Sequence, residues 1–267
     1  MYDFVTQGGL RNSMNVSEYT NNAVVGKGIL KVLFSPFYLD KYKFTKISDG
    51  TILNSYCYHD KYFEKQREMS SKMFWNDYFV DNGIKTPKLY ATTNPMVIYE
   101  DMQPEQEYIS KPNYGLQGTD IRVIKGKDVK PTESAYLIQE KIHSCEYEGG
   151  RSFRVVTTYD GEIMFVEELR NDTKITSNGV TGGKVKMCTS DMCGEYEKLR
   201  KPIQKLCELH RRDFGFCFCI GWDLMVDCND AYVIEGNWPP GLFNNKGELP
   251  QSFYELFTQK AKKFYSK

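Results

Sequence analysis

Two apolar segments near the carboxyl end of the chain constrain its fold most. Residues 216–226 and 231–235 both read as strands, and only the polar sequence Asp227-Cys228-Asn229-Asp230 separates them. So short a connection joins antiparallel neighbours, because parallel strands need a much longer crossover. The sequence therefore predicts an antiparallel hairpin here.

The other periodic segments predict an α+β chain with largely antiparallel sheets. A turn at Asp160-Gly161 predicts a second hairpin. Helices are expected where apolar residues recur at three- and four-residue steps, over residues 70–82, 196–210 and 252–264. The first of them has serine at its start and Gly83 directly after its end, which are capping signals. Further strands are expected after Pro87 and over residues 29–34, 96–99, 108–111, 121–124, 136–142, 152–159 and 162–167.

The composition excludes several classes of protein. A length of 267 residues, 40% of them hydrophobic, is enough to bury a substantial core. The 35 basic and 35 acidic residues balance, so nucleic acid is not an expected partner. No run reaches the roughly 20 apolar residues of a membrane span, and Met1-Tyr2-Asp3 does not begin a secretion signal. A cytoplasmic location is expected, and the oligomeric state is left open.

Eight cysteines raise the question of zinc or disulfides. Cys217 and Cys219 alternate along an apolar strand, as buried cysteines that act as small apolar residues do. We expect reduced thiols without zinc, because no paired zinc knuckles appear among Cys57, Cys145, Cys188, Cys193, Cys207, Cys217, Cys219 and Cys228. The scattered histidines are expected to be structural: His59, His143 and His210.

Three oxygen-bearing side chains should converge in the carboxyl-terminal hairpin. The turn places Asp223 near Glu235, and strand alternation puts Glu235 and Asn237 on one face. Two carboxylates and an amide oxygen suit Mg²⁺, with phosphate and water completing its shell. A merely polar hairpin face is the alternative, although the apolar Tyr232-Val233-Ile234 and a Trp-Pro-Pro-Gly exit flank the trio. The sequence predicts a Mg²⁺ site, with Mn²⁺ as a substitute.

A lysine and a glycine-bearing loop form a second signal. Lys111-Pro112 ends a predicted strand, and Gly115 and Gly118 follow. Glycines allow backbone N–H groups to approach phosphate, and the lysine supplies a charge. The loop matches neither the P-loop nor the dinucleotide fingerprint, so it indicates phosphate binding only weakly by itself.

The order of these motifs resembles that of ATP-grasp enzymes, over about residues 70–243. The similarity is greatest to the carboxylate-amine ligases, including the ribosomal-protein glutamate ligases, and to sugar-transfer-associated ATP-grasp proteins. The residues that carry it are Lys72, Lys111-Pro112 with Gly115 and Gly118, Gln139-Glu140-Lys141-Ile142, Ser152-Phe153-Arg154, Asp223 and Glu235-Gly236-Asn237-Trp238-Pro239-Pro240-Gly241.

The resemblance implies an ATP-grasp fold in which two α+β lobes with antiparallel sheets grip the nucleotide. A small lobe with the phosphate loop would occupy residues 70–142, and a large lobe with the metal site residues 143–267. Residues 1–69 would form a short amino-terminal region, which could be a reduced substrate domain.

The resemblance also implies roles for single residues. Lys72 and Lys111 would clamp the phosphates of ATP, under a loop that runs from Gly115 through Gly118 to Thr119. The adenine would be read by Glu140 and by the backbone of Lys141 and Ile142. Two arginines would face the phosphate and the developing charge, with an asparagine near the metal: Arg154, Arg170 and Asn178.

These roles have alternatives and gaps. Lys72 could be a solvated charge, and the two arginines could be salt-bridge partners. Ser152 stands where the ligases often have an acid that holds the ribose, a place that Glu146 or Glu148 could take.

The expected activity is an ADP-forming ligase that uses ATP and Mg²⁺ to join an unidentified carboxylate to an amine through an acyl phosphate. Two alternatives stay open: an ATP-grasp kinase that phosphorylates a sugar or inositol hydroxyl, and a non-catalytic nucleotide-binding protein.

Overall fold

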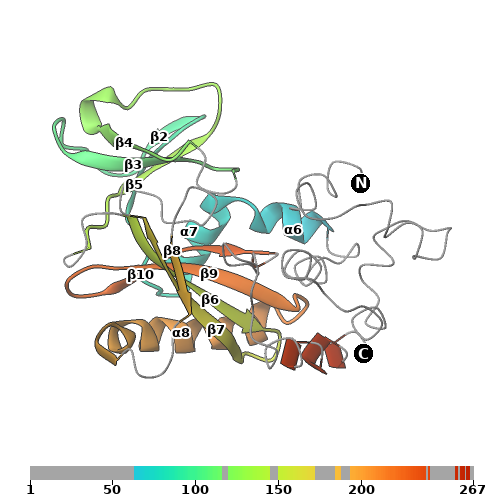
Figure 1. Cartoon of the computed structure of the whole chain (residues 1–267). Coiled ribbons are helices and arrows are strands. Elements are labelled where there is room, and N and C mark those ends of the chain that lie inside the picture. The colour runs from blue at the N-terminus through green and yellow to red at the C-terminus, as the bar shows by residue number, and fades with distance from the viewer. Residues whose placement is uncertain are drawn as a thin grey trace, which may run out of the picture.

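The computed structural model of the chain describes residues 63–115, 120–144, 150–171, 184–187, 193–238, 240, 256–257, 259–261 and 263–264 (Figure 1). Several expectations fall outside these residues: the strand at 29–34, most of the region 1–69, and the roles of Gly118, Thr119, Glu146, Glu148 and Asn178.

Two helices lie where the apolar spacing predicts them, α7 (Lys72–Asp81) and α8 (Cys193–Asp213). A further helix, α6 (Phe63–Met69), was not predicted. The Oγ of Ser71 caps α7 by accepting a hydrogen bond from the Phe74 N–H at 3.2 Å. After the helix, Gly83 has φ +65°, a left-handed conformation that glycine adopts without strain. Described residues between 256 and 264 are also helical, so the predicted helices are confirmed there.

The smaller of the two sheets is antiparallel throughout, with the strand order β2-β1-β5-β3-β4. Its strands are β1 (Leu89–Thr93), β2 (Met96–Ile98), β3 (Glu107–Pro112), β4 (Arg122–Lys125) and β5 (Tyr136–Glu140), with a 3-10 turn η3 (Gly126–Asp128) after β4. Ala91 in β1, Tyr108 in β3 and Ile138 in β5 form a small hydrophobic core in this sheet.

The larger sheet is also antiparallel, with the order β10-β9-β6-β7-β8. It consists of β6 (Gly150–Thr158), β7 (Ile163–Asn171), β8 (Lys184–Met187), β9 (Cys219–Val226) and β10 (Ala231–Asn237). Both predicted hairpins occur, as β6–β7 and β9–β10. Strand β8 was not predicted.

Helix α8 covers one face of the larger sheet (Figure 1). Its His210 is fully buried, with Nδ1 2.7 Å from Thr157 Oγ1 and Nε2 3.1 Å from the Cys217 carbonyl oxygen. The Trp222 indole N–H donates to the same Thr157 oxygen at 2.7 Å, so Trp222 points toward α8. His210 is a structural residue, as expected, and burial lowers its pKa to about 4.

Helix α7 packs against β10, and one close contact fixes its position. A Cβ added to Gly236 would lie 2.6 Å from a ring carbon of Trp75, so only glycine allows the indole to rest on the strand. Trp75 is 1% exposed, and its N–H donates to the Met69 carbonyl oxygen at 2.7 Å. The amino end of α7 is thereby held beside the end of β10.

The cysteines differ from expectation at one position. Cys207, Cys217 and Cys219 form no disulfide, but Cys228 is disulfide-bonded. The prediction of reduced thiols is therefore wrong for Cys228, because sequence spacing does not reveal which sulfurs meet in space. Separately, no helix within the described residues has the length and apolar character needed to cross a membrane.

Candidate functional site

Four charged side chains form a row across the larger sheet. The strand register pairs Glu235 with Asp223, Asp223 with Arg154, and Arg154 with Glu167. Directly opposed residues share a face of a sheet, so all four side chains project from one face. Trp222 precedes Asp223 and points toward α8, so the row, which we call the charged row, faces away from α8.

A bulge in β10 puts Glu235 into the charged row. The register shifts by one residue between Val233, which faces Leu224, and Glu235, which faces Asp223. Without the extra residue Ile234, Glu235 would be opposite Trp222 on the α8 face. Asn237 follows two residues later on the same face as Glu235.

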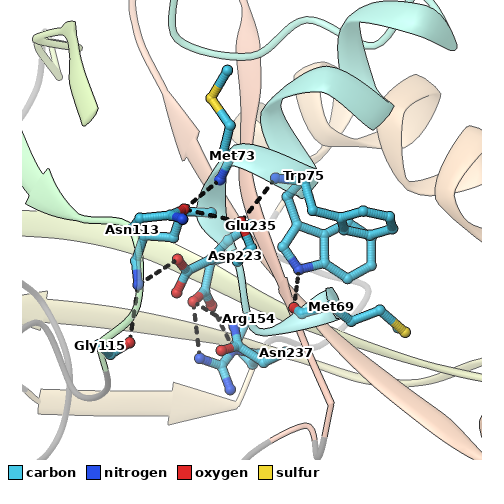
Figure 2. A network of polar contacts seen from close by, with 12 residues as sticks. Met69, Met73, Trp75, Asn113, Gly115, Arg154, Asp223, Glu235 and Asn237 are labelled. Atoms are coloured by element: carbon cyan, nitrogen blue, oxygen red, sulfur yellow. Dashed lines mark hydrogen bonds and ion pairs between the residues drawn. The ribbon is translucent and has the colours of Figure 1, made fainter. Parts of the chain in front are cut away.

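Asp223 is bound through both of its oxygens. Arg154 donates from Nε to Oδ1 at 2.5 Å and from Nη2 to Oδ2 at 3.0 Å. The Asn237 amide donates to Oδ2 at 3.1 Å, and Arg154 Nη1 donates to the Pro240 carbonyl oxygen. Figure 2 shows the guanidinium and the amide converging on the carboxylate. A two-point pair of this kind fixes both side chains.

Lys72 reaches the site from the first turn of α7. Its Nζ donates to the Gly115 carbonyl oxygen at 2.9 Å and lies 3.7 Å from Glu235 Oε2. The Oδ1 of Asn113 accepts from Ser71 Oγ at 3.0 Å and from the Met73 N–H at 2.9 Å (Figure 2). The start of α7 is therefore tied to the segment that follows β3.

Lys111 brings a second cation from β3 of the smaller sheet. It is 4% exposed. Burial lowers the pKa of Lys111 to about 8, and Lys72 lowers it further, while Glu235 and Asp223 act against this change. Lysines from two separate elements are thus within electrostatic range of the carboxylates of the larger sheet.

Glu167 is the member of the charged row that the sequence did not suggest. It is 3% exposed, and within the described part of the chain its Oε1 has no hydrogen-bond partner. Burial raises the pKa of Glu167 to about 7; Asp223 adds to this rise and Arg154 opposes it. The signal that could have found it is its place opposite Arg154 in the Asp160-Gly161 hairpin.

Arg170 does not lie with Arg154. It is three residues from Glu167 on β7, so its side chain belongs to the other face of the sheet. There its Nε donates at 2.6 Å to the buried Glu168, which also accepts from Arg151 at 2.5 Å. The proposed contact of Arg170 with substrate stays a prediction.

The expected adenine hinge lies where the chain leaves the smaller sheet for the larger one. Glu140 ends β5, its N–H donates to the Lys88 carbonyl oxygen at 2.8 Å, and its Oε2 accepts from the Lys88 N–H at 3.3 Å. Lys141 pairs with Glu107 at 2.6 Å, and Ile142 follows without regular structure. None of these contacts tests nucleotide recognition.

The oxygen-bearing side chains of Asp223, Glu235 and Asn237 suit a hard cation, although Asp223 already accepts hydrogen bonds from Arg154 and Asn237. Among the described residues no three His, Cys, Asp or Glu side chains gather around a metal position. The trio of Asp223, Glu235 and Asn237 instead offers two carboxylates and an amide oxygen, which is the chemistry Mg²⁺ selects. Arg154 donates to both Asp223 oxygens, so a metal ion there would compete with the guanidinium for the carboxylate.

Comparisons with known proteins agree with this architecture. The family model of the ATP-grasp domain matches residues 69–239. The crystal structure of the D-cycloserine synthetase DcsG aligns with a TM-score of 0.50 at 12% identity, over 74% of this chain and 71% of that one. No curated protein matches the chain in sequence.

Two ligase structures align with lower scores. D-alanine–D-alanine ligase from Bacillus anthracis, complexed with ATP, gives a TM-score of 0.49 at 18% identity, over 80% of this chain and 66% of that one. The ATP-grasp ligase PsnB, complexed with a phosphomimetic variant of its minimal precursor, Mg and ADP, gives 0.48 at 12% identity, over 80% and 68%. The chain thus spans about two thirds of the length of these ligases. Its two antiparallel sheets form the expected α+β ATP-grasp fold, and the protein belongs to the ATP-grasp domain family.

Proposed function

We propose that the protein is an ATP- and Mg²⁺-dependent ligase that joins a carboxylate to an amine and releases ADP and phosphate. The observation that carries this proposal is the meeting of two lysines from different elements with the carboxylates of the larger sheet. Lys72 lies 3.7 Å from Glu235. Glu235 and Asp223 attract the Lys111 ammonium and raise its pKa against the effect of burial.

The charges suggest how the nucleotide would be held. Lys72 and Lys111 repel each other, and a phosphate between them would remove that repulsion through charge-assisted hydrogen bonds. Asp223, Glu235 and Asn237 would hold Mg²⁺, which supplies charge neutralisation to the phosphates when bound. Catalysis would rest on positioning and charge stabilisation, without a protein nucleophile.

The proposed chemistry balances without any further reactant. A substrate carboxylate oxygen attacks the γ-phosphorus of ATP, the bond from that phosphorus to the β–γ bridging oxygen breaks, and ADP leaves. The amine then attacks the acyl carbon, phosphate departs, and the amine nitrogen loses a proton. The identities of the acid and the amine are open.

A kinase acting on a sugar or inositol hydroxyl is the second candidate, and one observation favours it. The ligase reading relies on two arginines that would hold a planar carboxylate. Arg170 lies on the opposite face of the sheet from Arg154, and Arg154 is paired with Asp223. Of the two arginines expected to hold the substrate carboxylate, only Arg154 therefore lies in the charged row that the structure describes.

The fate of the γ-phosphate separates the two candidates. The protein is incubated with Mg²⁺, γ-labelled ATP, hydroxylamine and a panel of acids or polyols. A ligase yields hydroxamate, ADP and free phosphate, because the acyl phosphate is electrophilic. Label in a hydroxylamine-resistant ester, without free phosphate, would establish the kinase instead. ATP that binds but is never consumed with any acceptor would count against both.

A further inference from the structure

Asp223 has two incompatible partners if the proposed function holds. Its oxygens are taken by Arg154 at 2.5 and 3.0 Å, and the same oxygens are the metal donors of the proposed site. A divalent cation that bound these oxygens would repel the guanidinium at close range, because both are positively charged. A second acceptor for Arg154 would relieve that repulsion when Asp223 binds metal.

The charged row supplies that acceptor on the other side of Arg154. Strand β6 lies between β9 and β7, so Arg154 has Asp223 as one cross-strand neighbour and Glu167 as the other. Directly opposed Cβ atoms lie about 5 Å apart, within reach of a long arginine side chain. Movement from one carboxylate to the other needs a change of side-chain torsions only.

The hydrogen bonding of the Glu167 carboxyl group differs from that of a buried residue with a purely structural role. Glu167 is 97% buried, yet Oε1 has no hydrogen-bond partner among the residues that the structure describes. Unpaired buried carboxyl oxygens are costly and call for an explanation. Burial acts to lower the pKa of Arg154, but the attraction of Asp223, and then of Glu167 and Glu235, outweighs it and raises that pKa. Glu167 thus already attracts the guanidinium that it does not hold.

We propose that Glu167 is a positioning residue that receives the Arg154 guanidinium when Asp223 turns to the metal and the nucleotide. Without ligand, Arg154 closes the site by holding Asp223. With ligand, Arg154 pairs with Glu167, so Asp223 and Glu167 are each matched by a cation. This inference rests on the proposed function.

The test measures binding rather than turnover. ADP affinity is determined by calorimetry over a series of Mg²⁺ concentrations. Glu167→Gln is compared with the wild type, and the double variant Arg154→Met/Glu167→Gln is compared with Arg154→Met. The exposed Glu133→Gln serves as control. Glu167→Gln should raise the Mg²⁺ concentration for half-maximal ADP binding by about tenfold or more, since the amide is a poorer acceptor for Arg154.

The double variant distinguishes the exchange from a general structural effect. In the Arg154→Met background no guanidinium holds Asp223, so Glu167→Gln should no longer change the Mg²⁺ requirement. An equal penalty in both backgrounds, or none in either, overturns the inference. A wild-type protein that does not bind ADP with Mg²⁺ refutes the proposed function, and this inference with it.

A second measurement does not depend on how well the variants fold. The Nε–H resonance of Arg154 in the wild-type protein, assigned with Arg154→Lys, should shift when ADP and Mg²⁺ are added together, and less with ADP alone. A resonance that stays unchanged under saturating ADP and Mg²⁺ contradicts the exchange of partners.

Discussion

Replacement of Glu167 by glutamine should stabilise the ligand-free protein at pH 8, and this gain should shrink as the pH falls. The side chain is 3% exposed, and burial, together with Asp223, raises its pKa from the ordinary 4.5 to about 7. Between these values the folded protein holds a proton that the unfolded chain has lost. The contribution of Glu167 to stability is complete below about pH 4.5 and is lost as the pH rises through about 7.

The size of the effect follows from the same two values. The difference between 4.5 and about 7 corresponds to about 3 kcal/mol, at about 1.4 kcal/mol for each pKa unit. Most of this change falls between pH 5 and pH 8. Glutamine mimics the protonated acid in shape and cannot ionise, so Glu167→Gln escapes this loss.

The wild type alone would not reveal the effect, because His210 opposes it. Burial lowers the pKa of His210 from 6.5 to about 4, so the unfolded chain gains a proton first as the pH falls. Stability from His210 is complete above about pH 6.5 and is lost as the pH falls toward 4. The two groups act with opposite sign over nearly the same range, and their contributions largely cancel.

The assay is therefore a difference between two proteins. Urea unfolding is followed at pH 5, 6, 7 and 8, with EDTA and without nucleotide, for the wild type, Glu167→Gln and the exposed control Glu133→Gln. The unfolding free energy of Glu167→Gln minus that of the wild type should grow by about 2–3 kcal/mol from pH 5 to pH 8. A difference that is constant with pH would show that Glu167 is already ionised in the folded protein.

Three further predictions concern the site. Lys111→Met should weaken the binding of ATP with Mg²⁺ by about 1.5–3 kcal/mol in calorimetry, whereas the exposed control Lys125→Met should not; equal affinities would remove Lys111 from the site. Glu235→Gln should abolish turnover in the labelled-ATP assay with little change in melting temperature, and activity that survives at saturating Mg²⁺ would contradict the metal assignment. Gly236→Ala should lower stability by about 1–3 kcal/mol in urea unfolding, because the new Cβ would lie 2.6 Å from Trp75; an unchanged midpoint would mean that the indole moves aside.

Elements that depend on local signals were predictable from the sequence. Helix α7 has a serine cap and a terminal glycine, and both hairpins have short polar turns, so their positions needed no knowledge of the rest of the chain. Strand β8 lacks such signals: it is four residues long, Lys184–Met187, with two lysines and no flanking turn motif among the described residues.

The site needed information that strand alternation does not contain. A regular hairpin pairing Ala231 with Val226 would put Glu235 opposite Trp222, away from Asp223. The bulge at Ile234 corrects the register, and nothing in the local sequence announces it. The convergence of Asp223 and Glu235 was predicted, but the physical reason for it was not.

Register also explains why the two arginines were grouped and Glu167 was overlooked. The family order suggests that Arg154 and Arg170 act together, although order along a chain does not say which face a side chain occupies. Once Arg154 is paired with Glu167, the odd spacing to Arg170 sends it to the opposite face, toward Glu168. The same pairing turns Glu167 from an ordinary strand residue into part of the site.

The charges of the side chains at the site favour a ligand that carries negative charge. Lys72, Lys111 and Arg154 face Asp223 and Glu235, and Glu167 is close to half protonated near neutral pH. A bare divalent cation would add to an existing excess of positive charge, so it gains little by entering alone. Phosphate groups reverse this balance, because they neutralise the lysines and bring their own oxygen ligands to the metal. Burial lowers the pKa of Lys111 and the nearby Lys72 lowers it further, so a phosphate bound beside the two lysines would favour the charged form of Lys111. Under the proposed function, we therefore expect the metal and the nucleotide to bind together, with the nucleotide supplying the negative charge that lets the metal compete with Arg154 for Asp223.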